Sequence, residues 1–351
     1  MVGAAQVEEP RGGNVLLVAG SGRSGTSLLS MILAQLGMHV PQPEVAADRT
    51  NPRGFGEPQW VVDFHERLLD NAVVRTSDAR PQAWFETAKQ GSRERFREEL
   101  TGWLSGQLEQ ADSLVIKDPR LLWFLSLWES ASERAGAESG FAVMLRPPAE
   151  VAKSKAASYG DRGGATDDVA AWVNMMLHVE RGTRGRRRSF VRYHDLLDDW
   201  TAPIAQLIDE QGLTFLHDSA YENVRAVHQL VDPGLNRSTL DIAQLDLPKR
   251  LRELAEETWH HLDQLASGST DPALLEGMDH LRAEYLELYA EAEAISRCTA
   301  MADARVAVRD ERRRRREARK AADAEGSPAA GARTRARRLL TRGAARLPGR
   351  G

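Results

Sequence analysis

Short apolar runs alternate along the chain with longer segments whose apolar side chains recur at helical spacing. Residues 14–19 (NVLLVA) form an apolar run that is too short for a helix. Residues 28–36 then repeat apolar side chains at helical spacing, and the repeat stops at Gly37. Between these segments, residues 20–27 (GSGRSGTS) contain glycines, hydroxyl side chains and one arginine. This order predicts a buried strand, a turn and a helix.

The alternation continues and predicts an α/β domain. Three further apolar runs, at residues 113–116, 141–145 and 189–193, predict strands. Segments with one apolar face predict helices that start near Glu57 and at residues 92–110, 120–135, 147–158 and 166–182. Helices that alternate with strands favour a central, mostly parallel sheet with helices on both faces, in three layers.

The C-terminal part is predicted to be helical from residue 202, with a break at residues 231–237. Its last apolar positions follow alternating steps of four and three, a period of about 3.5 that is typical of a heptad seam. These positions are Leu274, Met278, Leu281, Tyr285, Leu288, Ala292 and Ile295. The seam predicts either a homodimer through residues 274–306 or packing of this helix on its own domain.

Composition and charge divide the chain into a body and a tail. The 351 residues, 42% hydrophobic and 28% charged, are enough for one α/β domain and an extension. We expect a flexible N-terminus at residues 1–13, the domain at 14–270, a long helix with a coiled-coil pattern at 271–322 and a disordered basic tail at 323–351. From Met301 onward there are 16 basic and 6 acidic residues, against 31 basic and 45 acidic before it. The basic tail favours contact with an anionic membrane surface, and we expect no specific nucleic-acid partner.

Several features favour a bacterial cytoplasmic protein. No run approaches the roughly 18 consecutive apolar residues of a membrane span, and residues 1–13 lack the basic and then apolar regions of a signal peptide. A single cysteine, Cys298, excludes an internal disulfide and suits a reducing compartment. The inner face of the membrane is then the surface that the tail would contact. Only six of the 47 basic residues are lysine, a bias typical of a GC-rich bacterial genome, and this scarcity draws attention to Lys117 at a strand end.

The turn at residues 20–27 is predicted to bind an anion. Small residues let successive backbone N–H groups converge, and the following helix adds the partial positive charge of its N-terminus. A nucleoside-triphosphate P-loop requires a lysine after its second glycine, but here Thr26 follows Gly25, and the cation, Arg23, lies inside the loop. The dinucleotide fingerprint also fails, because no acidic residue ends a second strand about 20 residues later. The loop therefore indicates a phosphate-like or sulfate-like ligand held by a guanidinium group.

Three motifs resemble those of sulfotransferases that use 3′-phosphoadenosine 5′-phosphosulfate (PAPS). The RSGTS sequence at residues 23–27 resembles their 5′-phosphosulfate loop, and Arg146, followed eight residues later by Ser154, resembles the pair that holds the donor's 3′-phosphate. Residues 117–120 (KDPR) resemble the Lys-Asp-Pro segment of tyrosylprotein and many bacterial sulfotransferases. The motifs stand in the family's order within residues 14–200 and imply a P-loop-like α/β fold.

The resemblance also implies a donor site and a reaction that needs no metal. Arg23 and Lys117 would neutralise charge on the transferring group, and Arg146 and Ser154 would hold the 3′-phosphate of PAPS or of the product, adenosine 3′,5′-bisphosphate (PAP). Tyr193 would lie near the adenine, and Arg237 would be brought to the donor by the loop at 231–237. The residues implied for the 5′-phosphate are Gly22, Arg23, Ser24, Gly25, Thr26 and Ser27.

Three residues are candidates for the base that accepts the acceptor's proton. Glu57 ends the string NPRGFGE at residues 51–57, which resembles a string common in bacterial sulfotransferases. Glu44 follows Arg23 at a spacing similar to that of the base in tyrosylprotein and trehalose sulfotransferases. His65 has the more convenient ordinary pKa. We rank them in that order, and note that a carboxylate needs partial burial to act well near neutrality.

The resemblance implies sulfuryl transfer from PAPS to an acceptor hydroxyl or amine. The polar loop at residues 41–53 favours a glycan or glycoconjugate as acceptor. Two alternatives stay open at this point. One is a P-loop kinase acting on a small molecule, and the other is a non-catalytic scaffold that uses the heptads and the basic tail in an envelope or glycan-assembly complex.

Overall fold

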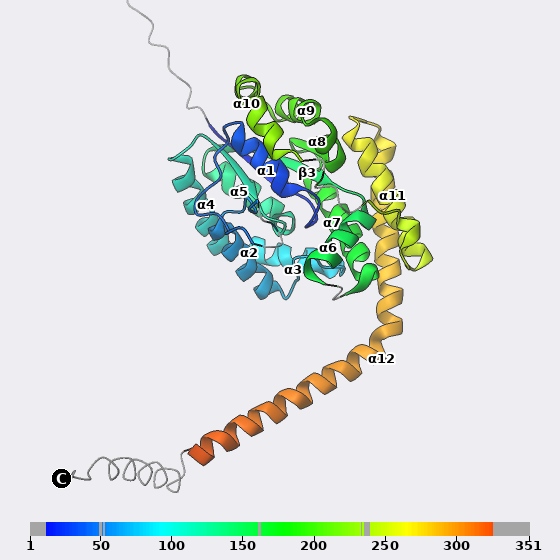
Figure 1. Ribbon diagram of the computed structural model, residues 1–351. Helices are drawn as coiled ribbons and strands as arrows, with labels where there is room; N and C mark the ends of the chain where they lie inside the picture. The colour runs from blue at the N-terminus through cyan, green and yellow to red at the C-terminus, as the bar shows by residue number, and fades with distance from the viewer. Residues whose placement is uncertain are drawn as a thin grey trace, which may run out of the picture. The chain divides into compact units, whose positions relative to one another are not determined.

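The computed structural model describes residues 12–48, 51, 53–160, 163–232, 234 and 239–325 (Figure 1). At its centre lies a four-stranded, all-parallel sheet with the strand order β2-β1-β3-β4. The strands are β1 (Gly13–Ala19), β2 (Ser113–Lys117), β3 (Ala137–Leu145) and β4 (Arg188–Arg192). All four predicted strands are therefore present, and the parallel α/β fold is confirmed.

Side chains alternate between the two faces of β1 and build two separate cores. Val15, Leu17 and Ala19 belong to one core, which includes residues of α2, α4, α5, α7 and α11. Leu16 and Val18 belong to the other, which includes residues of α1, α8, α9 and α10. Since a parallel sheet is buried on both faces, its strands are continuous apolar runs, and helices on both sides give three layers.

The helices match the predicted segments closely. Two differences concern strand and helix ends: the segment after β2 begins with a 3₁₀ turn, η1 (Leu121–Phe124), and Tyr193 starts α8 instead of ending β4, because β4 pairs with β3 only as far as Arg192. A helix at residues 82–91, α3, has no predicted counterpart. The remaining bounds are α1 (Thr26–Gln35), α2 (Gln59–Ala72), α3 (Gln82–Gly91), α4 (Glu94–Leu108), α5 (Leu125–Arg134), α6 (Pro148–Tyr159), α7 (Gly164–Thr183), α8 (Tyr193–Asp199), α9 (Thr201–Gln211), α10 (Leu216–Leu230), η3 (Ile242–Gln244), α11 (Lys249–Ala266) and α12 (Pro272–Glu325).

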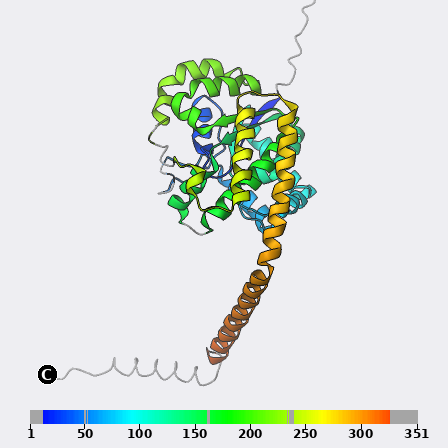
Figure 2. The same ribbon diagram turned by 90° about the vertical axis from the view of Figure 1, so that its right-hand side faces the viewer.

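The first part of the heptad seam packs on its own domain. Leu274, Met278, Leu281 and Tyr285 are buried, and the Tyr285 hydroxyl lies 2.6 Å from the carbonyl oxygen of Ala79. The start of α12 runs beside α11 (Figure 2), where a Cβ at position 277 would lie 2.3 Å from His261 Nε2. These residues are therefore not available to a second chain. The pattern predicted either a homodimer through residues 274–306 or packing on the same domain, and Leu274, Met278, Leu281 and Tyr285 follow the second of these.

The chain forms two compact units, Met1–Tyr289 and Ala290–Gly351. The boundary lies within α12, because the buried seam belongs to the first unit, whereas the predicted boundary lay at residue 270. In the second unit Ile295 is 84% exposed, and the arginines at 312–316 are exposed on the helix. Residues 326–351, most of the predicted basic tail, lie outside the described residues. In the described part of the chain, no helix has the length and apolar character that crossing a membrane requires.

Candidate active site

The turn between β1 and α1 has the backbone geometry of an anion-binding loop. Gly20, Arg23 and Gly25 all have positive φ angles, of 146°, 71° and 96°. A Cβ at Gly20 would lie 2.9 Å from the carbonyl oxygen of Met144, and one at Gly25 only 2.2 Å from Cδ2 of Tyr193. Both positions therefore require glycine for conformation and for space, and the loop is held between the end of β3 and the Tyr193 ring.

The N-terminus of α1 opens onto a cavity. Gly25 is the N-cap and has no side chain that could cap the helix, and the first turn contains no acidic residue. Thr26 and Ser27, the first two helical residues, line the cavity. N–H groups that no side chain caps and the helix dipole at this end favour an anionic ligand.

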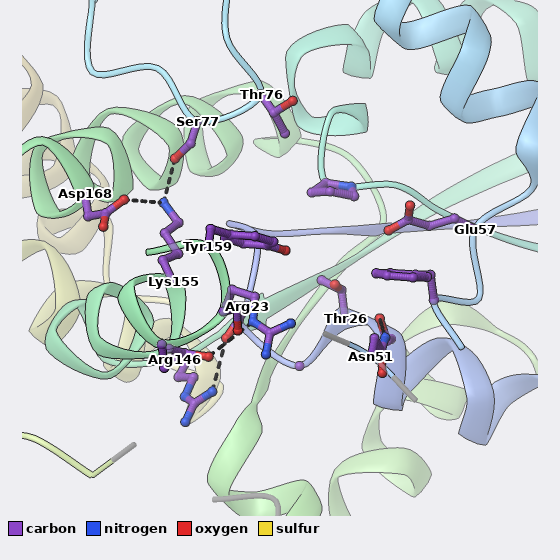
Figure 3. Close-up of a pocket in the computed structure, with 18 of the residues that line it drawn as sticks. Arg23, Thr26, Asn51, Glu57, Thr76, Ser77, Arg146, Lys155, Tyr159 and Asp168 are labelled. Atoms are coloured by element: carbon purple, nitrogen blue, oxygen red, sulfur yellow. Dashed lines mark hydrogen bonds and ion pairs between the residues drawn. The ribbon is translucent and has the colours of Figure 1, made fainter. Parts of the chain in front are cut away.

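The two predicted phosphate-binding motifs meet at this loop (Figure 3). Arg23 Nε donates to Ser154 Oγ at 3.2 Å, and Arg146 Nη1 donates to the carbonyl oxygen of Arg23 at 3.1 Å. The Arg146 guanidinium also lies over the Tyr193 ring, 4.4 Å from its centroid. The structure thus brings together Arg23, Arg146, Ser154 and Tyr193, which lie in the loop after β1, just after β3, in α6 and at the start of α8.

Two residues that sequence reasoning missed orient Arg146. Its Nε donates to Oε2 of Glu150, one helical turn further along the chain, at 3.0 Å. His194 Nε2 lies 3.0 Å from the same oxygen. The hydrogen bond to Glu150 raises the pKa of His194 above its ordinary value, against the effect of partial burial. Burial alone would raise the pKa of Glu150. The hydrogen bonds from His194 and Arg146 instead hold this pKa below its ordinary range. The i, i+4 spacing of Arg146 and Glu150 was the available sequence signal.

Lys117 joins the loop to a buried carboxylate. It is the last residue of β2, and its Nζ donates to Glu57 Oε1 at 2.5 Å and to Ser27 Oγ at 3.0 Å. The Asn51 amide also donates to Ser27 Oγ, at 3.4 Å. Glu57 is 7% exposed. Burial raises the pKa of Glu57 above the ordinary glutamate value, and the charge of Lys117 offsets this only in part. Such a carboxylate is better matched to proton transfer near neutrality than an exposed one.

The other two candidate bases lie elsewhere. His65 is fully buried: Trp128 Nε1 donates to its Nε2 at 2.9 Å, and its Nδ1 lies 3.2 Å from Asp118 Oδ2. Both ring nitrogens are thus engaged inside the core. Glu44 is bonded to the Gln42 amide at 2.7 Å and lines a separate hollow of about 330 Å³. Of the three, Glu57 is the one beside Lys117.

The large cavity has a volume of about 1240 Å³. Most of the predicted site residues line it: Gly22, Arg23, Gly25, Thr26, Ser27, Glu57, Lys117, Arg146, Ser154 and Tyr193. Ser24 does not, because its buried hydroxyl donates to the carbonyl oxygen of Ser21 at 2.7 Å and stabilises the turn. Arg237 lies outside the described residues. Among the described residues, no group of three or more histidine, cysteine, aspartate or glutamate side chains is arranged to hold a metal.

A second set of cavity residues was not singled out from the sequence. Lys155, Ser77, Asp168, Arg75 and Tyr159 line the part of the cavity formed by α6, α7 and the segment before α3. The signal that could have found Lys155 is the scarcity of lysine that drew attention to Lys117. Ser77 and Asp168 offered no such signal, since isolated polar residues near helix ends are common.

No protein-family model matches the chain, and no curated protein matches it. Among solved structures, the chain is similar to the sulfotransferase domain from the Synechococcus PCC 7002 olefin synthase, with a TM-score of 0.43 and 20% identity over 72% of this chain and 96% of that one. It is also similar to the sulfotransferase domain from the curacin biosynthetic pathway, with a TM-score of 0.42 and 17% identity over 72% of this chain and 98% of that one.

Proposed function

We propose that this protein is a sulfotransferase that moves a sulfuryl group from PAPS to an acceptor hydroxyl or amine. The observation that carries the proposal is the direct contact of Arg23 in the loop with Ser154 and Arg146, two residues more than a hundred positions away. The Arg23 loop and the Arg146–Ser154 pair could each bind a phosphate or sulfate ester separately. Their contact at one helix N-terminus suits a ligand with anionic groups at two ends, such as PAPS.

The described residues fit such a donor. The uncapped start of α1, with Thr26 and Ser27 lining the cavity, would hold the 5′-phosphosulfate. The guanidinium of Arg146, oriented by Glu150, would hold the 3′-phosphate together with Ser154. The ring of Tyr193 already lies against Arg146 and Gly25, and would provide an aromatic surface for the adenine.

The catalytic work falls to Lys117 and Glu57. When bound, the donor supplies the sulfuryl group and a phosphate leaving group. The acceptor oxygen forms a bond to sulfur while the bond from sulfur to the bridging phosphate oxygen breaks, and that oxygen keeps the electron pair. Glu57 would accept the acceptor's proton, and the Lys117 ammonium, with Arg23, would stabilise the charge that develops on the bridging oxygen. Because Lys117 also contacts Ser27, it links the proton acceptor to the donor loop.

A glycan or glycoconjugate is the acceptor that we propose. The cavity exceeds the volume of about 300–1,000 Å³ that is usual for one small ligand, so a donor and part of a larger acceptor have room together. The polar character of residues 41–53, which lead to Phe55 and Glu57 at the cavity, supports the same class.

Calorimetry and a transfer assay test the proposal. PAP should bind with no metal added, and sulfur-35-labelled PAPS should label a component of a bacterial glycan extract. ATP with magnesium that binds while PAP does not would favour the kinase alternative. Self-association of the full chain without any nucleotide binding would favour the scaffold alternative.

A further inference from the structure

The cavity has two chemically different halves, and the second half contains none of the residues that we assign to the donor. The first half brings Arg23, Lys117 and Arg146 to the N-terminal end of α1, which suits a polyanionic donor. The second half lies beyond Tyr159, where Figure 3 shows Lys155, Ser77 and Asp168 on the opposite side of that ring from Glu57. None of the sequence motifs accounts for these residues.

Cations and carboxylates are paired throughout the second half. Lys155 Nζ lies 3.3 Å from Asp168 Oδ1, and Arg75 donates to both carboxylate oxygens of Asp167, at 2.9 and 3.1 Å. A charge-balanced surface offers little attraction to an ionic ligand. It instead favours a neutral molecule that can both donate and accept hydrogen bonds.

Lys155 lines the cavity in a fixed position, as a ligand-binding side chain would. It is 8% exposed although it lines the cavity, and its Nζ donates to Ser77 Oγ at 2.6 Å. Burial lowers the pKa of Lys155, and the charge of Asp168 opposes that fall. An ammonium group has three donors, of which Ser77 and Asp168 occupy two in the described structure. A third donor on Lys155 and the second oxygen of Asp168 are thus a neighbouring donor and acceptor for the hydroxyls of a ligand.

The surrounding backbone fixes this arrangement in advance. The indole N–H of Trp123 donates to the carbonyl oxygen of Thr76 at 3.0 Å, and the amide of Arg75 donates to the buried carboxylate of Asp78 at 3.0 Å. The amide of Asn174, on α7, donates to the carbonyl oxygen of Asp78 at 2.8 Å. A segment held in this way presents Ser77 with little entropic cost to binding.

Tyr159 adds an apolar surface between the two halves. Its side chain belongs to a residue that is 50% exposed, at the end of α6, and Arg23 lies 5.9 Å from its ring centroid. An exposed aromatic ring beside hydrogen-bonding groups can bind the apolar face of a sugar ring while polar groups bind its hydroxyls.

We infer that Lys155, Asp168 and Ser77, with the ring of Tyr159, form the acceptor subsite, and that the acceptor group bound there is an uncharged sugar-like polyol. This inference rests on the proposed sulfotransferase function and narrows its acceptor class. It excludes uronic acids and amino sugars as the preferred group at this position.

The test uses three probes that share one ring and differ in charge: methyl glucoside, methyl glucuronide and methyl glucosaminide. Their affinities for the PAP-loaded full chain are measured by ligand-observed NMR. We expect the neutral glucoside to bind about tenfold more tightly than either charged analogue. Tighter binding of a charged analogue, or binding of none of the three, overturns the polyol class.

The double variant Lys155→Met/Asp168→Asn removes both charges together, so that no unpaired buried charge is left. We expect it to weaken the glucoside at least about tenfold and to leave PAP affinity within about twofold. Ser77→Ala is a milder variant for the same comparison, and a thermal melt checks the fold of each. The control Arg67→Met/Glu99→Gln removes an exposed ion pair between α2 and α4. It should change neither the affinity for the glucoside nor that for PAP. Unchanged glucoside binding in both subsite variants overturns the subsite, whereas a wild-type chain that does not bind PAP refutes the proposed function itself.

Discussion

The Lys117 ammonium and the Glu57 carboxylate lie 2.5 Å apart although 60 residues separate them in the sequence. Both are nearly excluded from solvent, with side-chain exposures of 4% and 9%. A buried pair of this kind is costly unless each member has further partners, and Lys117 has one in Ser27. We therefore assign the pair to the candidate active site. The first prediction concerns its carboxylate, Glu57.

Replacing Glu57 with glutamine should lower turnover by about a hundredfold or more, because the proton acceptor is lost. PAP affinity should change little, because the groups that we assign to the two phosphates remain. Turnover of the wild type requires the ionised carboxylate, so it should fall as the pH drops through the pKa of Glu57. Burial raises that pKa, so the fall should lie above the ordinary glutamate range. The pH dependence of kcat measures both effects.

The Lys117→Met variant tests the direction in which Lys117 shifts the pKa of Glu57. The charge of Lys117 lowers the pKa of Glu57, so its removal should move the acidic limb of the remaining activity to higher pH. A limb that moves to lower pH would contradict the assignment. An active Glu57→Gln variant with an inactive Glu44→Gln variant would instead assign the base to the loop at residues 41–53.

Arg146→Ala should weaken PAP about tenfold to a hundredfold more than adenosine 5′-phosphosulfate, which lacks the 3′-phosphate, because a hydrogen bond to a charged group contributes about 1.5–3 kcal/mol. Arg146 also contacts the carbonyl oxygen of Arg23, so some weakening of both ligands is expected. Ser154→Ala is the smaller change at the same anchor. Calorimetry with both ligands would disprove the 3′-phosphate assignment if their affinities fell equally.

His194 should stabilise the fold in a pH-dependent way. Its pKa in the folded protein is raised by Glu150, so its contribution is complete below the unfolded value of about 6.5 and is lost as the pH rises through the folded pKa. The difference in Tm between the wild type and His194→Gln should therefore be larger at about pH 6 than well above the folded pKa. In a Glu150→Gln background the same comparison should show no such pH dependence. Equal differences at both pH values would mean that the Glu150 contact contributes nothing.

Leu281→Ala should lower the free energy of unfolding by about 2–5 kcal/mol, because Leu281 is fully enclosed in the core of the first unit. The control Ile295→Ala, at an exposed position of the same helix, should change it by less than about 0.5 kcal/mol. Denaturant titration gives both values, and light scattering gives the mass. A Leu281→Ala variant with normal stability and a lower mass would show that the seam joins two chains after all.

The sequence by itself determined the order of strands and helices and the nature of the loop. Apolar runs such as residues 14–19 and 113–116 are local signals, and they coincide with β1 and β2 to within one residue at each end. The positive φ angles at Gly20 and Gly25 are also local features, and glycine in the sequence indicates them because it adopts positive φ at little cost. Charged residues at strand ends, such as Lys117 and Arg146, could be predicted to converge, because the carboxyl ends of parallel strands meet at one edge of the sheet.

Only the tertiary structure decided between residues that the sequence left equivalent. Glu57, Glu44 and His65 all follow the loop at residues 20–27 in the sequence. Burial separates Glu57 from Glu44, and the contact with Lys117 separates it from His65, which is also buried. The same holds for the cluster of Lys155, Ser77 and Asp168, whose members come from α6, the segment before α3 and α7. The heptad pattern was ambiguous for a related reason. An apolar face predicts that the helix will be buried on that side, but the packing of the whole chain determines which partner buries it.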